Sequence, residues 1–435
     1  MRPVHKRITR RTFFRQAGGA AAGLGAGLSL PTVITSNALG GPGVAPASER
    51  ILIGCIGVGN QGGGNMSKHI KNVIAVCEVD KNRLAEAKAK VEKTTGRSCA
   101  AYGDYRKLLE NKDVDAVVIT VPDHWHALIT VNACEAGKDV YCEKPLTLTI
   151  YEGRVMVKAA RKYDRIVQTG SQQRSADNFR LACELVRSGR LGKIHTVRAG
   201  ISGVNFKGPA VPDSDPPPEL DYNFWLGPAP WKPYNVKRVH YNFRFFWDYS
   251  GGQMTNWGAH HLDIAQWGLD MDESGPIAAE TTAPPRYNKE GWFEVPEWCE
   301  VTYKYANGIT LICGQDQRGG TTFEGENGTI YVNRSKLESK PADIIKEPLK
   351  GSDIHLYVSK DHHQNWLDCI KTRQMPIGDV EIGHRSATVC HLGNIAIRSG
   401  KKVTWDPVKE EIVGDAELAK RVHYAYRAPW RLPEL

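Results

Sequence analysis

The chain has 435 residues, 41% of them hydrophobic and 24% charged, which is enough for two domains with substantial cores. Its net charge is +9, but residues 1–38 contain six Lys and Arg and no acidic residue, so the remainder carries only +3. That balance does not indicate a nucleic-acid partner or binding to an anionic membrane. No apolar run reaches the roughly 18 residues that a membrane-spanning helix needs.

Two adjacent arginines near the N-terminus are followed by a weakly apolar segment. Arg10 and Arg11 precede Phe13 and Phe14, and an Ala/Gly-rich run then continues to Pro31. This arrangement resembles the twin-arginine export signal, whose cargo is exported already folded. The alternative interpretation is a disordered basic N-terminus.

A small-x-small site ending at Ala38 offers a cleavage point. We therefore expect residues 1–38 to be a signal peptide that the twin-arginine export machinery recognises, residues 39–49 to be a linker, and the mature protein to be periplasmic. No Cys near the cleavage point could carry a lipid anchor. We expect no stable membrane insertion after cleavage.

A glycine-rich turn follows the first strand-length apolar run, in "RILIGCIGVGNQGGGNM". Gly57, Gly59 and Gly62 fit the pattern G-x-G-x-x-G, with Asn60 and Gln61 between them. Such a turn brings backbone N–H groups against a pyrophosphate at a helix N-terminus. The pattern alone is weak evidence for a nucleotide-binding site, because glycine-rich turns are common. The sequence around it decides whether such a site is expected.

A second apolar run, "NVIAVCEVD", supplies that context. It places Glu78 about twenty residues after Gly57, where a dinucleotide-binding fold has an acid for the adenosine ribose. The Glu78 carboxylate would repel a 2′-phosphate, so we expect NAD as cofactor in preference to NADP. Asp80 either reinforces this preference or begins the next helix.

Strand and helix patterns alternate through the first half. The expected elements are a helix over 81–93, a strand over 114–122, a helix ending at Gly137, a strand over 139–145, a helix over 149–164 and a strand over 165–173. This predicts a doubly wound parallel α/β sheet of the Rossmann type over 50–173, with ligands at the carboxyl ends of its strands. Candidate cofactor-binding residues at such ends are Pro122, His126, Glu143, Lys144 and Gln172.

The second half, 174–435, has a different pattern. A helix over 176–192 and a strand over 193–203 precede a Pro-rich excursion, and later strands carry hairpin turns at Asn307-Gly308 and Asn327-Gly328. We expect an α+β domain with a mainly antiparallel sheet, followed by a C-terminal helix and tail.

Four motifs resemble the glucose–fructose oxidoreductase, inositol dehydrogenase and MocA (Gfo/Idh/MocA) family: "TVPDHWHA", "CEKPLTLT", "SGRLGKIHTVRAG" and "GGQMTNWGAHHLDIAQW". The similarity extends from about Arg50 to at least Gly400. It implies an NAD-dependent oxidoreductase acting on CH–OH groups of a sugar, cyclitol or derivative, with an open sheet that closes the substrate pocket and a homo-oligomeric assembly. The later C-terminal segment is similar to sugar-type members that carry an export signal.

Asn256 and His260 stand four residues apart on a predicted helix after Gly251-Gly252, so they share one face. Oxidising an alcohol requires a base for the hydroxyl proton and a cation for the developing alkoxide. The resemblance implies that His260 and Lys144 fill these roles. From the residues alone, Lys144 could be a surface lysine and His260 a hydrogen-bonded core histidine.

Many family members have Asp where this chain has Asn256. An amide can orient an imidazole but cannot stabilise an imidazolium, and losing such a charge commonly moves a pKa by about 1–3 units. We therefore expect His260 to be a weaker base here. Two alternatives stay open: a redox-neutral glycoside-cleaving or epimerising enzyme, and a non-catalytic dinucleotide-containing sugar-binding protein.

Export in the folded state has a consequence for the cofactor. Free NAD is a cytoplasmic metabolite, so we expect the protein to bind it before export and to hold it tightly.

Metal binding is not expected. The ten cysteines include no C-x-x-C pair, and several, such as Cys55, Cys77 and Cys313, lie in apolar runs typical of buried thiols. The clusters His260-His261-x-Asp263 and 361–363 lack ligand spacing, because adjacent histidines point apart.

Overall fold

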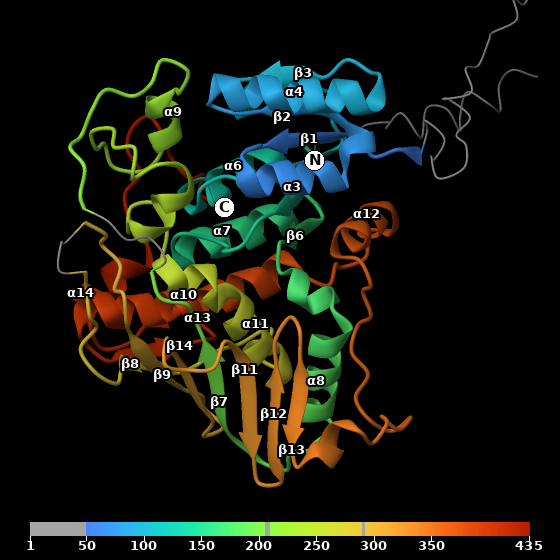
Figure 1. Ribbon diagram of the computed structural model, residues 1–435, viewed down its shortest axis with the longest axis vertical. Coiled ribbons are helices and arrows are strands. Elements are labelled where there is room, and N and C mark those ends of the chain that lie inside the picture. The colour runs from blue at the N-terminus through green and yellow to red at the C-terminus, as the bar shows by residue number, and fades with distance from the viewer. Residues whose placement is uncertain (1–48, 205–208, 289–291) are drawn as a thin grey trace, which may run out of the picture. The chain divides into compact units, whose positions relative to one another are not determined.

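The computed structural model describes residues 49–204, 209–288 and 292–435. The expected signal peptide, and the linker apart from its last residue, therefore lie outside the described residues. Figure 1 shows two sheets, one in the upper part of the view and one in the lower, with helices between them.

The first sheet is parallel throughout and confirms the predicted Rossmann topology. Its six strands run in the order β3-β2-β1-β4-β5-β6, so the strand order reverses between β1 and β4 and leaves a crevice at their carboxyl ends. The strands are β1 (Ile53–Ile56), β2 (Val73–Cys77), β3 (Ala100–Tyr102), β4 (Ala116–Ile119), β5 (Asp139–Cys142) and β6 (Val167–Thr169). β3 was not expected, because its three residues carry no periodic pattern.

Three of the five helices of this half begin at a residue whose side chain caps the helix. Asp80 accepts hydrogen bonds from two backbone N–H groups of α4, and Thr149 forms a capping box with Glu152 at the start of α7. The helices are α3 (Asn60–Lys68), α4 (Lys81–Thr95), α5 (Tyr105–Glu110), α6 (His126–Glu135) and α7 (Ile150–Lys162), with short 3₁₀ turns η2 (Ile70–Asn72), η3 (Asp123–Trp125) and η4 (Gln172–Ser175).

The second sheet is mainly antiparallel, as expected. Its order is β13-β12-β11-β7-β10-β9-β8-β14-β15, and β7 and β10 form its parallel pair. The two predicted hairpin turns hold Gly308 at φ +88° and Gly328 at φ +139°. The strands are β7 (Ile194–Gly200), β8 (Ala278–Thr281), β9 (Glu300–Lys304), β10 (Thr310–Gly314), β11 (Gly320–Gly325), β12 (Gly328–Val332), β13 (Leu337–Lys340), β14 (Val403–Asp406) and β15 (Glu411–Ile412).

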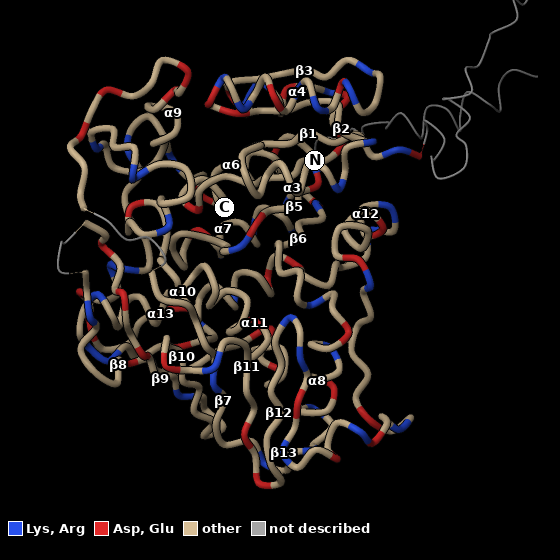
Figure 2. The backbone as a smooth tube through the Cα atoms, viewed as in Figure 1, with Lys and Arg blue, Asp and Glu red and all other residues tan. Residues whose placement is uncertain are grey.

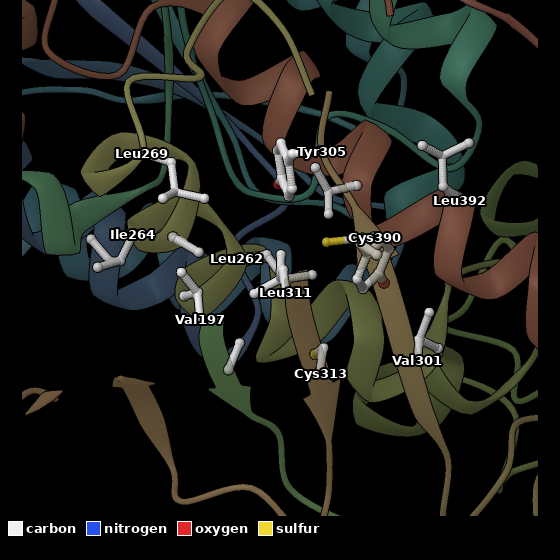
Figure 3. Packing of buried hydrophobic residues seen from close by; sticks show 14 of the residues in the cluster. Val197, Leu262, Ile264, Leu269, Val301, Tyr305, Leu311, Cys313, Cys390 and Leu392 are labelled. Carbon is white, nitrogen blue, oxygen red and sulfur yellow. The ribbon is translucent and has the colours of Figure 1, made fainter. Parts of the chain in front are cut away.

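Three helices cover the face of this sheet that is turned toward the first: α8 (Asp177–Arg187), α11 (Gly258–Gly268) and α13 (Val380–Ser399). Every residue of α11 is buried, since it packs against α13 as well as against β7 and β11. Figure 3 shows this core, where Leu262 of α11, Leu311 of β10 and Cys390 of α13 lie close together.

Residues far along the chain complete the core of the first sheet. Trp366 of α12 (His362–Thr372) is fully buried against Tyr141, and Trp430 of the tail packs edge-on against Trp125 with ring centroids 4.9 Å apart. No division separates the residues of Ile51–Leu435 into two units. The expected boundary at 173/174 lies between the two sheets, and contacts from helices late in the chain cross it.

The remaining elements are mostly short. They are α9 (Tyr222–Leu226), η5 (His240–Phe245), α10 (Gly252–Asn256), η6 (Ala342–Ile345), α14 (Ala416–Ala419) and η7 (Lys420–Val422). Figure 2 shows acidic and basic residues interspersed along both halves. All ten cysteines are described, buried and free, as predicted. Within the described residues, no helix is long and apolar enough to cross a membrane.

A buried ion-pair network joins η4 to α11. Arg174, 1% exposed, donates from Nε to both carboxylate oxygens of Asp263 at 3.0 and 2.9 Å, and its other nitrogens donate to Asp272. Burial raises the pKa of Asp263, and Arg174 opposes that effect.

We expect Arg174→Met to lower the free energy of unfolding by about 3–5 kcal/mol, because it leaves the Asp263 carboxylate buried without a counter-charge. Chemical denaturation measures this. Arg187→Met is a matched control, since Arg187 pairs with Asp270 at the surface, and should cost less than about 1 kcal/mol. Equal losses in the two variants would show that the buried pair does not stabilise this junction.

Candidate functional site

A cavity of about 940 Å³ lies at the carboxyl ends of the parallel strands, bordered on its other side by the second half of the chain. It brings together twelve of the thirteen residues predicted for the site. They are Gly57, Gly59, Asn60, Gln61, Gly62, Glu78, Pro122, Glu143, Lys144, Gln172, Asn256 and His260.

The glycine loop has no room for side chains. A Cβ on Gly57, whose φ is +78°, would lie 2.2 Å from the carbonyl oxygen of Thr120, and one on Gly62 would lie 2.1 Å from the Gly57 carbonyl. α3 begins directly after Gly59, so the first N–H groups of the helix face the cavity without helical partners. These features fit the pyrophosphate of a dinucleotide.

Glu78 lies beside this loop and is hydrogen-bonded to it. Its carboxylate accepts hydrogen bonds from the backbone N–H groups of Val58 at 3.0 Å and Val79 at 2.9 Å. Burial raises the pKa of Glu78, while those N–H groups and the nearby Arg83 lower it. Asp80 caps α4, so it does begin the next helix, and it also lines the cavity near Glu78.

Arg83 also lines the cavity, and the sequence reasoning missed it. Its guanidinium lies where a Cβ on Gly59 would be, and its Nε is 3.8 Å from the Asp80 carboxylate. The available signal was a basic residue in the first turn of the helix that follows the second strand.

The Pro-rich excursion of the second half returns to the first sheet beside Glu78. Lys81 N–H donates to the Glu219 carbonyl at 3.0 Å, and Asp221 N–H donates to the Val79 carbonyl at 3.0 Å. Leu220 forms an antiparallel bridge with Asp80 and lines the cavity. This strap, residues 219–221, ties the second half of the chain to the adenosine end of the site.

Glu143 is held by neutral donors. Its Oε1 accepts hydrogen bonds from Asn65 Nδ2 and Gln172 Nε2, both at 3.0 Å, and the side chain is 6% exposed. The carboxylate therefore has a fixed position beside Lys144 without forming an ion pair.

His126 requires a correction. Its ring lies between the carbonyl oxygens of Val121 at 2.9 Å and Pro145 at 2.8 Å, and it does not line the cavity. It begins α6, and both ring nitrogens are engaged by the loops after β4 and β5. His126 thus braces the loops that carry Pro122 and Lys144 and does not contact the cofactor space.

Asn256 contacts Lys144, not His260. Lys144 Nζ donates to both the backbone carbonyl and Oδ1 of Asn256 at 3.0 Å, and Asn256 Nδ2 donates to Gln253. The predicted single helix is two helices, α10 and α11, joined at Trp257, and His260 N–H bonds to the Trp257 carbonyl three residues back. The assumed pairing of Asn256 with His260 is therefore wrong.

His260 is buried at the same end of the cavity. Its Nδ1 is buried and has no hydrogen-bond partner among the residues described. Burial, together with the positive charges of Lys144 and Arg334, holds the pKa of His260 well below its ordinary value. The imidazole is therefore neutral near pH 7, and the lowered pKa makes it a weaker base than an ordinary histidine.

Lys144 has its own pKa shift. Burial lowers the pKa of the Lys144 ammonium group, Glu143 and Asp123 oppose the change, and Arg244 and Arg334 add to it. A cation with few charged partners at the carboxyl end of β5 is able to stabilise alkoxide charge or to exchange a proton.

Arg244 of η5 and Arg334 of the β12–β13 turn line this end as well, with Trp257. Arg334 stacks over the Trp257 ring at 5.0 Å, and Arg244 lies 4.0 Å from the Tyr241 ring centroid. No local pattern marked either arginine, because each reaches the cavity from an irregular segment.

The histidine and acid clusters considered for a metal have other partners. His261 Nδ1 lies 2.6 Å from the Gly200 carbonyl, and Asp263 binds Arg174. His362 Nε2 lies 2.8 Å from the Thr169 carbonyl, and His363 Nδ1 lies 3.0 Å from His69 Nε2. In the described part of the chain, no group of three or more His, Cys, Asp or Glu is arranged to hold a metal ion.

Known sequences match the chain in parts. It is 35% identical to myo-inositol 2-dehydrogenase of Thermotoga maritima over 176 residues, which are 39% of this chain and 47% of that protein. It is 29% identical to a glycosyl hydrolase family 109 protein of Shewanella pealeana over 203 residues, 43% of this chain and 44% of that one. These matches span about half the length of each relative.

Solved structures share the whole architecture. The WlbA dehydrogenase of Bordetella pertussis, in complex with NADH and UDP-GlcNAcA, superposes with a TM-score of 0.60 at 17% identity, over 82% of this chain and 99% of that one. Aldose-aldose oxidoreductase of Caulobacter crescentus gives 0.59 at 19% identity, over 82% and 100%. At these identities the likeness shows the fold alone.

Two family descriptions match nearly all of the described chain. The "NAD-binding Rossmann fold" of the oxidoreductase family covers residues 51–171, and its "C-terminal alpha/beta domain" covers residues 182–432. The glycine loop and Glu78 belong to the first match, and Asn256, His260 and Arg334 to the second. The chain therefore belongs to the Gfo/Idh/MocA oxidoreductase family and carries that family's NAD-binding domain.

Proposed function

We propose that this protein transfers a hydride between a CH–OH group of a sugar, cyclitol or derivative and a tightly held NAD. The observation that carries the proposal is the convergence of Lys144, Asn256 and His260, from both halves of the chain, on the cavity that also contains the glycine loop. Bound NAD supplies the hydride acceptor at this centre.

Residues of the chain would stabilise the alkoxide charge and accept the hydroxyl proton. The Lys144 ammonium group donates a hydrogen bond to the substrate hydroxyl oxygen and stabilises its developing negative charge. The neutral His260 imidazole takes the hydroxyl proton. Asn256 holds Lys144 in place through two acceptors without adding a charge.

Tight retention of the dinucleotide is supported by the strap. Its backbone hydrogen bonds to Val79 and Lys81 connect the second half to the adenosine end, and we propose that this connection slows release of the dinucleotide. A dinucleotide that does not exchange must return to its starting state in each turnover. This favours transfer between two substrates, or a redox-neutral reaction on one substrate.

The redox-neutral alternative has one specific support. Several relatives are named as glycosyl hydrolase family 109 proteins, and one, from Shewanella oneidensis, is named alpha-N-acetylgalactosaminidase, 26% identical over 224 residues. A non-catalytic sugar-binding role stays a third hypothesis, which the intact Lys144 and His260 disfavour. Sugar release without net dinucleotide reduction would identify the glycoside-cleaving reaction.

The dinucleotide itself provides the first test. We expect the purified protein, after long dialysis and denaturation, to release near-stoichiometric NAD and no NADP, because Glu78 lies where a 2′-phosphate would bind. Enzymatic assay of the supernatant measures both. An empty protein that binds added NAD weakly and frees NADH would be an ordinary dehydrogenase without retention.

Substitution tests the assigned roles. Lys144→Ala and His260→Ala should each slow reduction of the bound dinucleotide by sugar about 10²–10⁴-fold while leaving it bound, as loss of a general acid–base group does. Lys107→Ala and His195→Ala, at exposed positions, serve as controls. Full activity in either the Lys144 or the His260 variant would show that the substituted residue has no catalytic role.

The contact between Asn256 and Lys144 predicts a pH effect. Asn256→Asp places a carboxylate 3.0 Å from the ammonium group, which should raise the pKa of Lys144 by about 1–3 units. The limb of the kcat/KM profile that depends on Lys144 then moves to higher pH. Asn307→Asp, in an exposed hairpin turn, should leave the profile unchanged. An unshifted limb in the Asn256 variant would show that this contact does not control Lys144.

Location stays a proposal: we expect a periplasmic protein exported through the twin-arginine route. Arg10 and Arg11 both changed to Lys should leave the protein in the cytoplasm, as cell fractionation would measure. Unchanged export of this variant would show that residues 1–38 are not a twin-arginine signal. The family resemblance also implies a homo-oligomer. Sedimentation equilibrium on the mature chain would measure its oligomeric state.

A further inference from the structure

Two arginines border the hydride-transfer end of the cavity without a carboxylate partner. Arg244 and Arg334 line it beside Lys144, and neither forms an ion pair with any residue that the structure describes. Two other arginines have carboxylate partners: the buried Arg174 binds Asp263 and Asp272, and the half-buried Arg154 binds Glu381 and Glu410. Arg244 is likewise half-buried, and Arg334 is exposed at the mouth of the cavity it lines.

The carboxylates that line this end have neutral partners. Glu143 accepts from Asn65 and Gln172, and Asp123 accepts from Ser250 Oγ at 2.5 Å. Burial also raises the pKa of Asp123, which favours its uncharged form.

The cations act on one another. Arg244 and Arg334 both lower the pKa of Lys144, and Arg334 also lowers that of His260, so both guanidinium groups are close enough to repel charge at the reacting centre. Oxidised NAD would bring a further positive charge on its nicotinamide ring. Glu143 and Asp123 offset part of this positive charge, and an anionic ligand would offset more of it.

Aromatic rings hold both guanidinium groups. Arg334 stacks over Trp257, and Arg244 lies 4.0 Å from the ring centroid of Tyr241 and 4.8 Å from that of Phe243. Arg244 Nη1 donates to the Tyr241 carbonyl, and the other N–H groups at the edges of the two guanidinium planes are available for a carboxylate or phosphate.

The cofactor's own phosphates do not account for this arrangement. The glycine loop and the start of α3 form the pyrophosphate site, and Arg83 serves that end, where it acts on Glu78. Arg334 instead acts on Glu143, Lys144 and His260, which belong to the hydride-transfer end.

We propose that the substrate is an anionic sugar or cyclitol, bearing a carboxylate or a phosphate ester, whose charge is bound by Arg244 and Arg334. This inference rests on the proposed function, since it names the substrate class of the same site.

The test compares charged and neutral probes on the dinucleotide-containing protein. D-glucuronate, D-glucose 6-phosphate, D-glucose and inorganic phosphate are titrated while tryptophan fluorescence is followed, with Trp257 beside Arg334 as the reporter. Wild type should bind the anionic probes saturably and more tightly than D-glucose. The stronger of glucuronate and glucose 6-phosphate identifies the carboxylate or the phosphate ester as the preferred group.

Arg244→Gln and Arg334→Gln should each weaken binding of the anionic probes about 10–100-fold, the effect of losing a hydrogen bond to a charged group. Affinity for D-glucose and the content of bound NAD should not change. Arg318→Gln is the matched control, because Arg318 also stacks on an aromatic ring, that of Tyr331, but pairs with Glu338 outside the cavity.

Three results are decisive. Equal affinity for charged and neutral sugars, or anion binding that survives both substitutions, overturns the inference while leaving sugar oxidation intact. Arginine-dependent anion binding without reduction of the bound dinucleotide by any sugar supports the anion site and contradicts the proposed function. Circular dichroism and the content of bound NAD show that each variant is folded.

Discussion

The site depends on one half-buried cation, Lys144. Lys144 follows strand β5, and the second half of the chain supplies the two oxygens of Asn256 to which its ammonium group donates. A buried ammonium group without acceptors would cost several kcal/mol. The hydride-transfer end is therefore complete only while α10 lies against the carboxyl end of the parallel sheet.

Several remote contacts maintain that position. α13 packs on α7 and β6 of the first half and on β8 and β9 of the second. Trp366 and Trp430 add buried aromatic surface from late in the chain. α13 therefore connects the two halves, because it packs against elements of both sheets.

The sequence predicted the features that local pattern determines. Alternating apolar runs gave the parallel sheet, and the glycine spacing with Glu78 gave the cofactor end, since tight turns and strand ends are local properties. The site residues that were predicted wrongly, or missed, depend on contacts between distant segments. His126 binds the carbonyl of Pro145, Asn256 turns to Lys144 because the helix breaks at Trp257, and Arg244 and Arg334 come from irregular segments.

All ten cysteines are buried, so their thiols become accessible to oxidants only when the protein unfolds. Burial raises the pKa of the Cys55 and Cys142 thiols far above their ordinary value, so almost no thiolate is present in the folded state to react with oxidants. Exposed thiols are usually converted to disulfides in oxidising compartments, and the burial of all ten cysteines would protect them in such a compartment. Once the core opens, many cysteines become reactive together and wrong pairings would block refolding. The lifetime of the protein outside a reducing environment is thus set by the rate at which it unfolds, and not by the equilibrium between its folded and unfolded forms.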